Sequence, residues 1–207
     1  MSLWRELPIL LAISIVIALV VRTFLLQSFW IPSGSMENTL QRGDRVLVNK
    51  LVYRFTEPER GDVIVFKAPM EWRSNPEDED FIKRIIAVGG DTVSYSDVDR
   101  AISVNGRALD ESAYVYKDPE TGAVDLPSRD GYEFSVTVPH GRLWVMGDHR
   151  SASGDSRENY LRNGNDVVNA TIPVDSVVGH AFMIIWPLDR MTWLTAPGSY
   201  HRISEPA

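Results

Sequence analysis

The sequence predicts a mainly β protein, built on an antiparallel β-sheet, with a single N-terminal transmembrane helix. Three observations support this fold class. Short runs rich in β-branched and aromatic residues alternate with Gly, Pro, Asn and Asp through residues 32–207. Outside the N-terminus, no long segment repeats its apolar residues with the period of a helix. The chain opens instead with an uncharged, apolar run from Leu7 to Val21.

The opening run predicts a membrane anchor over residues 7–30. As a helix, Leu7–Val21 alone would span about 22 Å, which is less than the ~30 Å hydrocarbon core of a bilayer. Apolar residues resume after Arg22, and a long Arg side chain near a helix end can reach the interface. A cleaved signal peptide is the alternative, but the first small-x-small triplet is the distant Ser33–Ser35. We therefore expect an uncleaved anchor.

The strands of the sheet are expected where alternating or continuous apolar runs end at turn residues. A hairpin is expected over Ala101–Leu109, because Asn105 and Gly106 tolerate the positive φ angles of a type I′ turn. Met70–Asp80 and Asp118–Gly131 are polar and are expected to be loops. The remaining expected strands are Arg45–Phe55, Asp62–Phe66, Phe81–Val88, Tyr132–Val138, Leu143–Met146 and Val177–Trp186.

The composition excludes several kinds of site. The 207 residues include no Cys, which excludes disulfides, thiolate metal sites and a thiol nucleophile. With 21 Lys and Arg against 28 Asp and Glu, the net charge is −7, which argues against a nucleic-acid partner. The four His residues are scattered without the spacing of metal ligands. A hydroxyl group is therefore the expected nucleophile if the chain is a hydrolase.

One candidate segment is Ile31-Pro32-Ser33-Gly34-Ser35-Met36, directly after the predicted anchor. Two hydroxyls flank a Gly, which permits unusual backbone angles and a close approach to a ligand. Taken alone, the segment could equally be an ordinary linker turn.

A second candidate is Lys83, in the predicted strand Phe81–Val88. Strand alternation places Lys83 on the same face as Phe81 and Ile85. Desolvation by apolar neighbours lowers the pKa of an ammonium group and leaves an amine that can accept a proton. Taken alone, a solvated Lys on an edge strand is the alternative.

The third candidate segment runs from Gly147 to Arg157 after a hydrophobic strand. Its two Asp and two Arg residues can form an ion-paired, hydrogen-bonded loop of fixed geometry. A flexible surface turn is the alternative.

Together these segments resemble the type I signal peptidase family of membrane-anchored Ser–Lys endopeptidases. Pro32–Met36 resembles its nucleophile box, and Lys83–Asp91 its lysine box. Gly43–Val46 and Arg60–Phe66 resemble the structural strands between those boxes, and Gly147–Arg157 resembles the last box. The boxes stand in the family's order, from the anchor to about residue 186. The resemblance implies the antiparallel β-sheet catalytic domain of that family.

The resemblance also implies a mechanism. Ser35 would be the nucleophile and Lys83 the general base. The Ser35 backbone N–H and the Ser33 hydroxyl would form the oxyanion hole, and Ser153 would orient the Lys83 side chain. Neither a metal nor another cofactor is implied. The loop that carries Ser153 would be supported by Asp148, Arg150, Asp155 and Arg157.

The implied substrates are exported preproteins with signal peptides, cleaved after small residues at positions −1 and −3. The substrate would bind as an added extended strand. Shallow apolar pockets would be lined by Ile31, Pro32, Met36, Leu40, Phe81, Ile82 and Ile86.

A Lys base is typical of the bacterial members, which implies a single-pass protein of the bacterial plasma membrane. The lipid bilayer and a nearby secretion translocon would then be further partners. Met70 and Trp72 either dip into the interface or belong to an ordinary surface loop. The implied organisation is a cytoplasmic segment 1–6, the anchor 7–30 and an extracytoplasmic catalytic domain 31–207, whose core is about 31–93 and 136–190 with an insertion at about 94–135.

Two residues depart from the family pattern. Asn38 stands where the family usually has Pro, and His149 where many members carry Asn. We assign no catalytic role to His149. An anchored β domain that binds peptides without cleaving them, or an inactive family member, remains the alternative function. A self-cleaving repressor relative would need a DNA-binding N-terminal domain, and the predicted anchor stands in its place.

Overall fold

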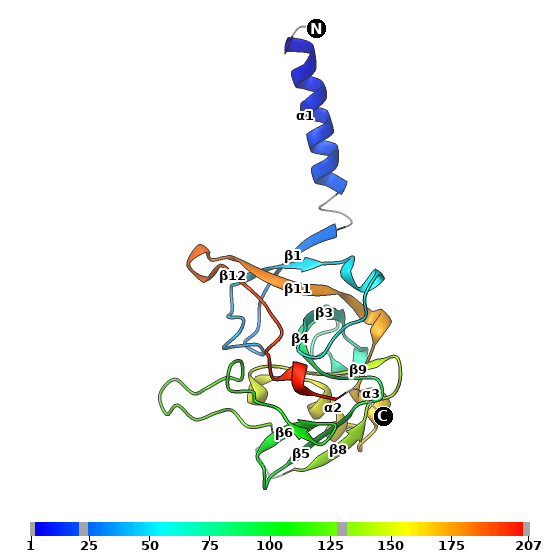
Figure 1. Ribbon diagram of the computed structural model, residues 1–207, viewed down its shortest axis with the longest axis vertical. Coiled ribbons are helices and arrows are strands. Elements are labelled where there is room, and N and C mark those ends of the chain that lie inside the picture. The colour runs from blue at the N-terminus through cyan, green and yellow to red at the C-terminus, as the bar shows by residue number, and fades with distance from the viewer. Residues whose placement is uncertain (1–2, 21–24, 128–131, 205–207) are drawn as a thin grey trace.

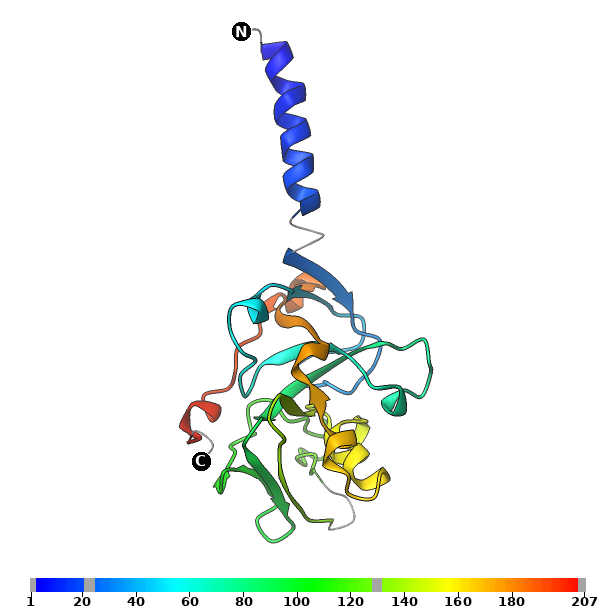
Figure 2. The ribbon, with the colours of Figure 1, turned by 90° about the vertical axis from the view of Figure 1, so that its right-hand side faces the viewer.

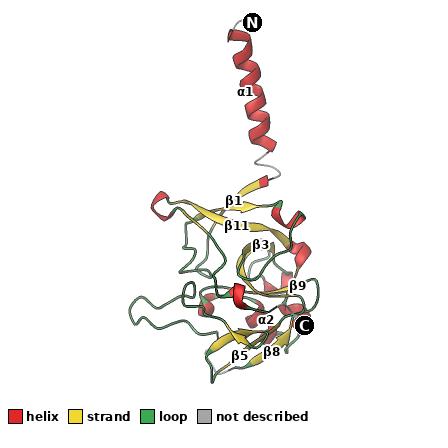
Figure 3. Ribbon diagram, in the orientation of Figure 1, coloured by secondary structure: helices red, strands yellow, loops and turns green. Residues whose placement is uncertain are grey.

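The computed structural model describes residues 3–20, 25–127 and 132–204. Helix α1 (Leu3–Val20) projects away from a body of strands, and both views place the body on its C-terminal side (Figures 1 and 2). Strands and loops dominate that body, and its helices are short (Figure 3). The predicted mainly β, antiparallel class is therefore confirmed.

In the described residues, eight strands form one antiparallel sheet in the order β1-β2-β11-β3-β4-β9-β10, with β12 paired to β11. A separate sheet has the order β7-β6-β5-β8. The bounds of the first sheet are β1 (Leu26–Trp30), β2 (Arg45–Asn49), β3 (Val63–Lys67), β4 (Asp80–Val88), β9 (Arg142–Met146), β10 (Ile172–Pro173), β11 (Val177–Trp186) and β12 (Thr192–Trp193). Those of the second are β5 (Thr92–Ser96), β6 (Ala101–Val104), β7 (Arg107–Ala108) and β8 (Phe134–Thr137).

Short helical segments connect these strands. After β9 the chain forms the α-helices α2 (Ser156–Arg162) and α3 (Val167–Ala170). The sequence did not reveal α2, because its seven residues are too few to show a helical period. The 3₁₀ turns are η2 (Val52–Arg54), η3 (Met70–Trp72), η4 (Arg150–Ala152), η5 (Val174–Ser176), η6 (Leu188–Arg190) and η7 (Tyr200–Arg202).

The predicted anchor over residues 7–30 is wrong at its C-terminal end, from Leu26 to Trp30. Leu26–Trp30 is strand β1, which pairs with β2 from Leu26↔Asn49 to Trp30↔Arg45. Phe29 packs against the cluster of Ile31, Val46 and Val48, so part of the apolar run serves the sheet and not a helix. Residues 21–24 lie outside the described part of the chain. Within that part, no helix has both the length and the apolar character needed to cross a bilayer.

Most predicted strands are present, with two informative differences. The strand expected over Arg45–Phe55 ends at Asn49, whose side chain accepts hydrogen bonds from the backbone N–H groups of Leu51 and Val52 and precedes η2. The predicted type I′ hairpin is confirmed, with φ of 52° at Asn105 and 75° at Gly106. Strand β5 was not predicted.

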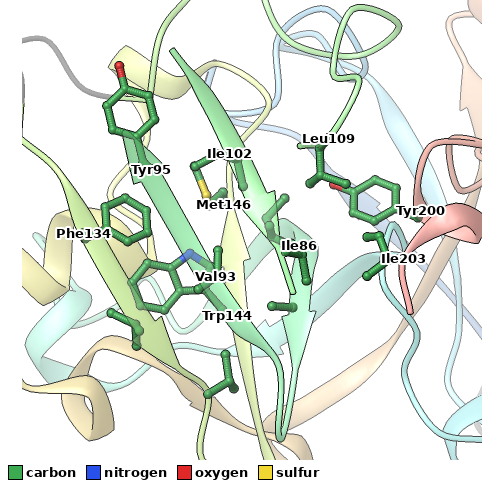
Figure 4. Close-up of a cluster of buried hydrophobic side chains, with 14 of the residues drawn as sticks. Ile86, Val93, Tyr95, Ile102, Leu109, Phe134, Trp144, Met146, Tyr200 and Ile203 are labelled. Carbon is green, nitrogen blue, oxygen red and sulfur yellow. The ribbon is translucent and has the colours of Figure 1, made fainter. Parts of the chain in front are cut away.

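The core consists of three clusters on the faces of the two sheets. The cluster between the sheets includes Trp144, Phe134 and Ile86, with stacked Phe134 and Trp144 rings (Figure 4). Strand β4, which carries Lys83, contributes side chains to all three clusters: Ile86 to this one, Ile82 to that of Ile31 and Met36, and Ile85 to the third. Burial of these side chains holds β4 and the end of β9 in a fixed position.

Candidate active site

Ser35 lies in the loop between β1 and β2, which is closed at its base by backbone hydrogen bonds. Ile31 N–H donates to Asp44 O at 2.9 Å, and Gly43 N–H donates to Ile31 O at 2.9 Å. Met36 and Leu40 are fully buried beneath the loop. The apolar side chains therefore fix the segment 31–40 on the sheet, and Ser35 is held between them at 6% exposure.

Lys83 reaches this loop from the middle of β4. Strand β4 lies between β3 and β9, so its backbone is paired on both sides. The Lys83 side chain is buried, and its Nζ atom lies 2.6 Å from Ser35 Oγ. The ring of Phe81, on the same face, is 5.6 Å from Nζ. These contacts place an amine and a hydroxyl in direct hydrogen-bond contact inside the protein.

Burial determines the protonation of Lys83. Desolvation lowers the pKa of Lys83 to about 8, although the charges of Asp155 and Asp148 act in the opposite direction. At neutral pH a usable fraction of the amine is therefore unprotonated, and the neutral form can accept a proton from Ser35.

Gly147, directly after β9, permits the close contact between the last box and Ser35. A Cβ atom at this position would lie 2.4 Å from both Ser153 Oγ and Ser35 O. The backbone N–H of His149 donates to Ser35 O at 3.1 Å. The chain from Gly147 to Ser153 therefore packs directly on the nucleophile loop, and no larger residue fits at its start.

A buried ion pair supports the same region. Arg84 donates to both carboxylate oxygens of Asp148 at 2.9 and 2.6 Å, and the pair is almost completely buried. Thr39 Oγ1 donates to the same carboxylate at 2.5 Å. Asp148 therefore joins strand β4 to the nucleophile loop. The sequence indicated Asp148 but not Arg84 or Thr39, since strand alternation says only that Arg84 lies opposite Lys83.

The other predicted supporting residues form a second network. Asp155 caps α2 by accepting from Arg157 N–H at 3.2 Å, and it also accepts from Gly147 N–H at 3.1 Å. Arg157 donates to Arg150 O at 2.6 Å and to a second carbonyl, that of Pro127. These bonds hold both ends of the 147–157 loop together.

Arg150 has a partner that the sequence did not indicate. Its guanidinium forms two hydrogen bonds with Glu111, at 2.6 and 3.1 Å, and it also donates to Gly147 O at 2.9 Å. Glu111 lies 39 residues away, in the segment predicted to be an insertion. A pairing between such distant residues has no local sequence signal.

The hydroxyls of Ser33 and Ser153 differ in their surroundings. Ser33 is exposed at the surface of the nucleophile loop. Ser153 Oγ is buried and has no hydrogen-bond partner in the described part of the chain. The predicted hydrogen bond from Ser153 to Lys83 is therefore not formed in this structure, although the contact of both serines with Gly147 keeps Ser153 beside Ser35.

The predicted pocket residues separate into groups. Ile31, Met36 and Leu40 belong to one cluster, with partly buried Ile82 against it. Pro32 is exposed beside Ser33. Phe81 packs against a different cluster, that of Phe66 and Ile85. Ile86 does not join them. It is fully buried in the cluster of Trp144 between the two sheets, because the bulge after Ile85 changes the register with β9 (Figure 4).

The Trp72 side chain is not placed for the contact with the membrane interface that was one alternative for it. Its side chain is 5% exposed, packs edge-on against Phe66, and donates from Nε1 to Asn169 O at 2.9 Å. Met70 in the same turn is 64% exposed. No group of three His, Cys, Asp or Glu side chains among the described residues could hold a metal ion.

Sequence comparison identifies the family. The sequence model described as signal peptidase, peptidase S26, matches residues 4–186. The chain belongs to the signal peptidase family, peptidase S26. Membership in the signal peptidase family makes the chain a peptidase, in agreement with the resemblance found in its sequence.

Two signal peptidase relatives come from mycobacteria. A probable signal peptidase I of Mycobacterium leprae is 41% identical over 232 residues, which cover 91% of this chain and 78% of the relative. A signal peptidase I of Mycobacterium tuberculosis is 42% identical over 223 residues, which cover 91% and 74%. A crystal structure of a signal peptidase I from Enterococcus faecalis aligns with 60% of this chain and 97% of that chain, at 26% identity and a TM-score of 0.41.

Proposed function

We propose that this signal peptidase family member is a serine endopeptidase that removes signal peptides from exported preproteins, with Ser35 as nucleophile and Lys83 as general base. The contact of 2.6 Å between Lys83 Nζ and Ser35 Oγ carries the proposal. The lowered pKa of Lys83, about 8, supports it, because a general base works best when its pKa is near the working pH.

The proposed reaction has two steps. Ser35 Oγ attacks the scissile carbonyl carbon while its proton moves to Lys83, and a tetrahedral intermediate forms. The Lys83 ammonium then gives this proton to the leaving amine as the C–N bond breaks. In the second step Lys83 removes a proton from a water molecule that attacks the acyl-enzyme. The Lys83 ammonium then returns this proton to Ser35 Oγ as the ester C–O bond breaks and the acid product leaves.

The groups around Ser35 would stabilise the intermediate. The Ser35 backbone N–H and the exposed Ser33 hydroxyl are the proposed donors to the oxyanion. Ser153, whose buried hydroxyl is unpaired, would accept a hydrogen bond from Lys83 when the amine is protonated to an ammonium group. The proposed supporting residues are Asp148, Arg150, Asp155 and Arg157, through the bonds described above.

We infer a preference for small residues at substrate positions −1 and −3. The apolar side chains beside Ser35 are already closely packed, with Ile31 at 2% exposure and Met36 and Leu40 at 0%. Such packing leaves room only for shallow pockets. We retain Ile31, Pro32, Met36, Leu40, Phe81 and Ile82 as the proposed lining, and we leave out Ile86 because of its place between the sheets.

We propose that α1 attaches the chain to the bacterial plasma membrane, with the β domain on the extracytoplasmic side, where a translocon would deliver preproteins. Apolar α1 side chains such as Leu7 and Leu10 are more than half exposed, which needs a partner of low polarity. Trp30, Trp186 and Trp193 are also exposed, on strands at the α1 end of the body (Figure 1). Aromatic side chains favour the interfacial region of a bilayer.

The test uses the full chain in detergent with a preprotein that carries Ala at −1 and −3. Wild type is expected to release the mature protein, while Ser35→Ala and Lys83→Ala each leave the preprotein intact. If wild type binds the preprotein and never cleaves it, the chain is a peptide-binding domain. If Lys83→Ala cleaves at the wild-type rate, the assignment of the base is wrong.

A further inference from the structure

His149 lies between two carboxylates beside the nucleophile loop. Its Nδ1 atom is 2.9 Å from Glu37 Oε2, and its Nε2 atom is 3.9 Å from Asp125 Oδ2. Its backbone N–H also donates to Ser35 O at 3.1 Å. One residue therefore connects the loop of Ser35 to the segment around Asp125.

Other contacts hold the imidazole in this position. The ring of Tyr116 stacks on it, with centroids 3.9 Å apart and planes inclined by 16°. Asp125 accepts from Ser151 N–H at 2.7 Å, and Asp125 N–H donates to Tyr116 O at 2.9 Å. The His149 side chain is only 15% exposed. The segment 116–125 therefore presents a rigid wall of one aromatic ring and one carboxylate to His149.

The carboxylate of Glu37 lies directly against the backbone before the nucleophile. A Cβ atom at Gly34 would stand 2.5 Å from Glu37 Oε1, and Glu37 N–H donates to Gly34 O at 3.0 Å. The side chain thus folds back over Gly34. Position 34 needs Gly because a Cβ atom would collide with Glu37, and not because of an unusual φ angle. Arg42 is a cationic neighbour of Glu37 at 3.6 Å, but its side chain is 70% exposed, so screening by water leaves little attraction.

This placement has an electrostatic consequence. The proposed oxyanion donors, on Ser33 and Ser35, flank Gly34. An unpaired negative charge on Glu37 would raise the free energy of a negatively charged intermediate at that point. The contact of 2.9 Å with His149 Nδ1 holds the Glu37 carboxylate in place and keeps it turned away from the reacting atoms.

We propose that His149 is a positioning residue, which holds Glu37 against the nucleophile loop and away from the proposed oxyanion site. The proposal rests on the proposed peptidase function. His149 touches no reacting atom in this arrangement, and it acts through Glu37 and through the Ser35 carbonyl.

The test compares His149→Ala, Glu37→Gln and the double variant by steady-state cleavage of the preprotein. His149→Ala is expected to lower kcat by about tenfold with KM nearly unchanged, because the Glu37 carboxylate is no longer held away from the proposed oxyanion site. Adding Glu37→Gln removes the charge, and kcat is expected to return to within about threefold of wild type.

His201→Ala is the matched control, because His201 is exposed in η7, and it should not change kcat. A double variant no faster than His149→Ala, or a His149→Ala variant as fast as wild type, would overturn the proposal. If wild type itself does not cleave, the proposed function fails separately. The pair is then judged by the unfolding midpoints of the same variants, where additive shifts show that His149 and Glu37 are not coupled.

Discussion

The protonation of Lys83 makes a quantitative prediction about the pH dependence of cleavage. Burial lowers the pKa of Lys83 to about 8, and only the neutral amine can remove the proton of Ser35. About half of the amine is neutral at pH 8, about one tenth at pH 7 and about one hundredth at pH 6. We expect kcat/KM to fall about tenfold for each pH unit below 8 and to level off above it.

The assay measures initial rates of preprotein cleavage from pH 5.5 to 9.5 at constant ionic strength. Lys67→Met is the matched control, because Lys67 lies on the adjacent strand β3 and is half exposed, paired with Glu79 and Asp80. It should leave the acid limb in place. An acid limb near pH 10, or rates that do not depend on pH over this range, would refute the assignment of a desolvated Lys83 as base.

The same shift predicts that Lys83 destabilises the fold at neutral pH. The unfolded chain keeps the ordinary pKa of 10.5, so between pH 8 and 10.5 it binds more protons than the native state, and stability rises with pH. Below pH 8 the full penalty of about 3 kcal/mol is present. Lys83→Met should therefore be inactive yet more stable than wild type at pH 7, and this gain should vanish near pH 10.5. Thermal unfolding at both pH values measures it, and an equal gain at both would contradict the linkage.

Three further substitutions test the packing. Gly147→Ala should lower kcat/KM by about 10²-fold, because the new methyl group displaces Ser35. A rate near that of wild type would show that the nucleophile loop can move to accommodate the methyl group. Asp148→Asn should reduce the free energy of unfolding by about 3–5 kcal/mol in denaturant titrations, since it leaves Arg84 charged and buried without its partner. Trp72→Phe should cost about 1 kcal/mol in the same titrations through its lost hydrogen bond, and vesicle binding should not change.

Local patterns in the sequence were sufficient for part of the fold. Strand β11 was predicted with its observed bounds, because Val177–Trp186 is apolar except at Gly179 and His180 and ends at Pro187. The Asn105-Gly106 turn was predicted because its chemistry depends on two adjacent residues. Residues 26–30 were assigned wrongly because an apolar run has no signal that separates a membrane helix from a strand covered by its neighbours.

The candidate site shows the same division. Ser35, Lys83 and the Gly147–Arg157 loop were indicated by the sequence alone, since each belongs to a short motif whose residue types serve one chemistry. The same motifs carry the resemblance to the signal peptidase family, and the family comparison agrees with it.

The contacts that give those motifs their properties are long-range. Arg150 pairs with Glu111, Arg84 with Asp148, and His149 with Glu37, and each pair joins residues at least 39 positions apart. The lowered pKa of Lys83 likewise depends on burial by several segments of the chain. Motif residues are local properties of a chain, whereas desolvation and ion pairing arise only when distant segments exclude water together.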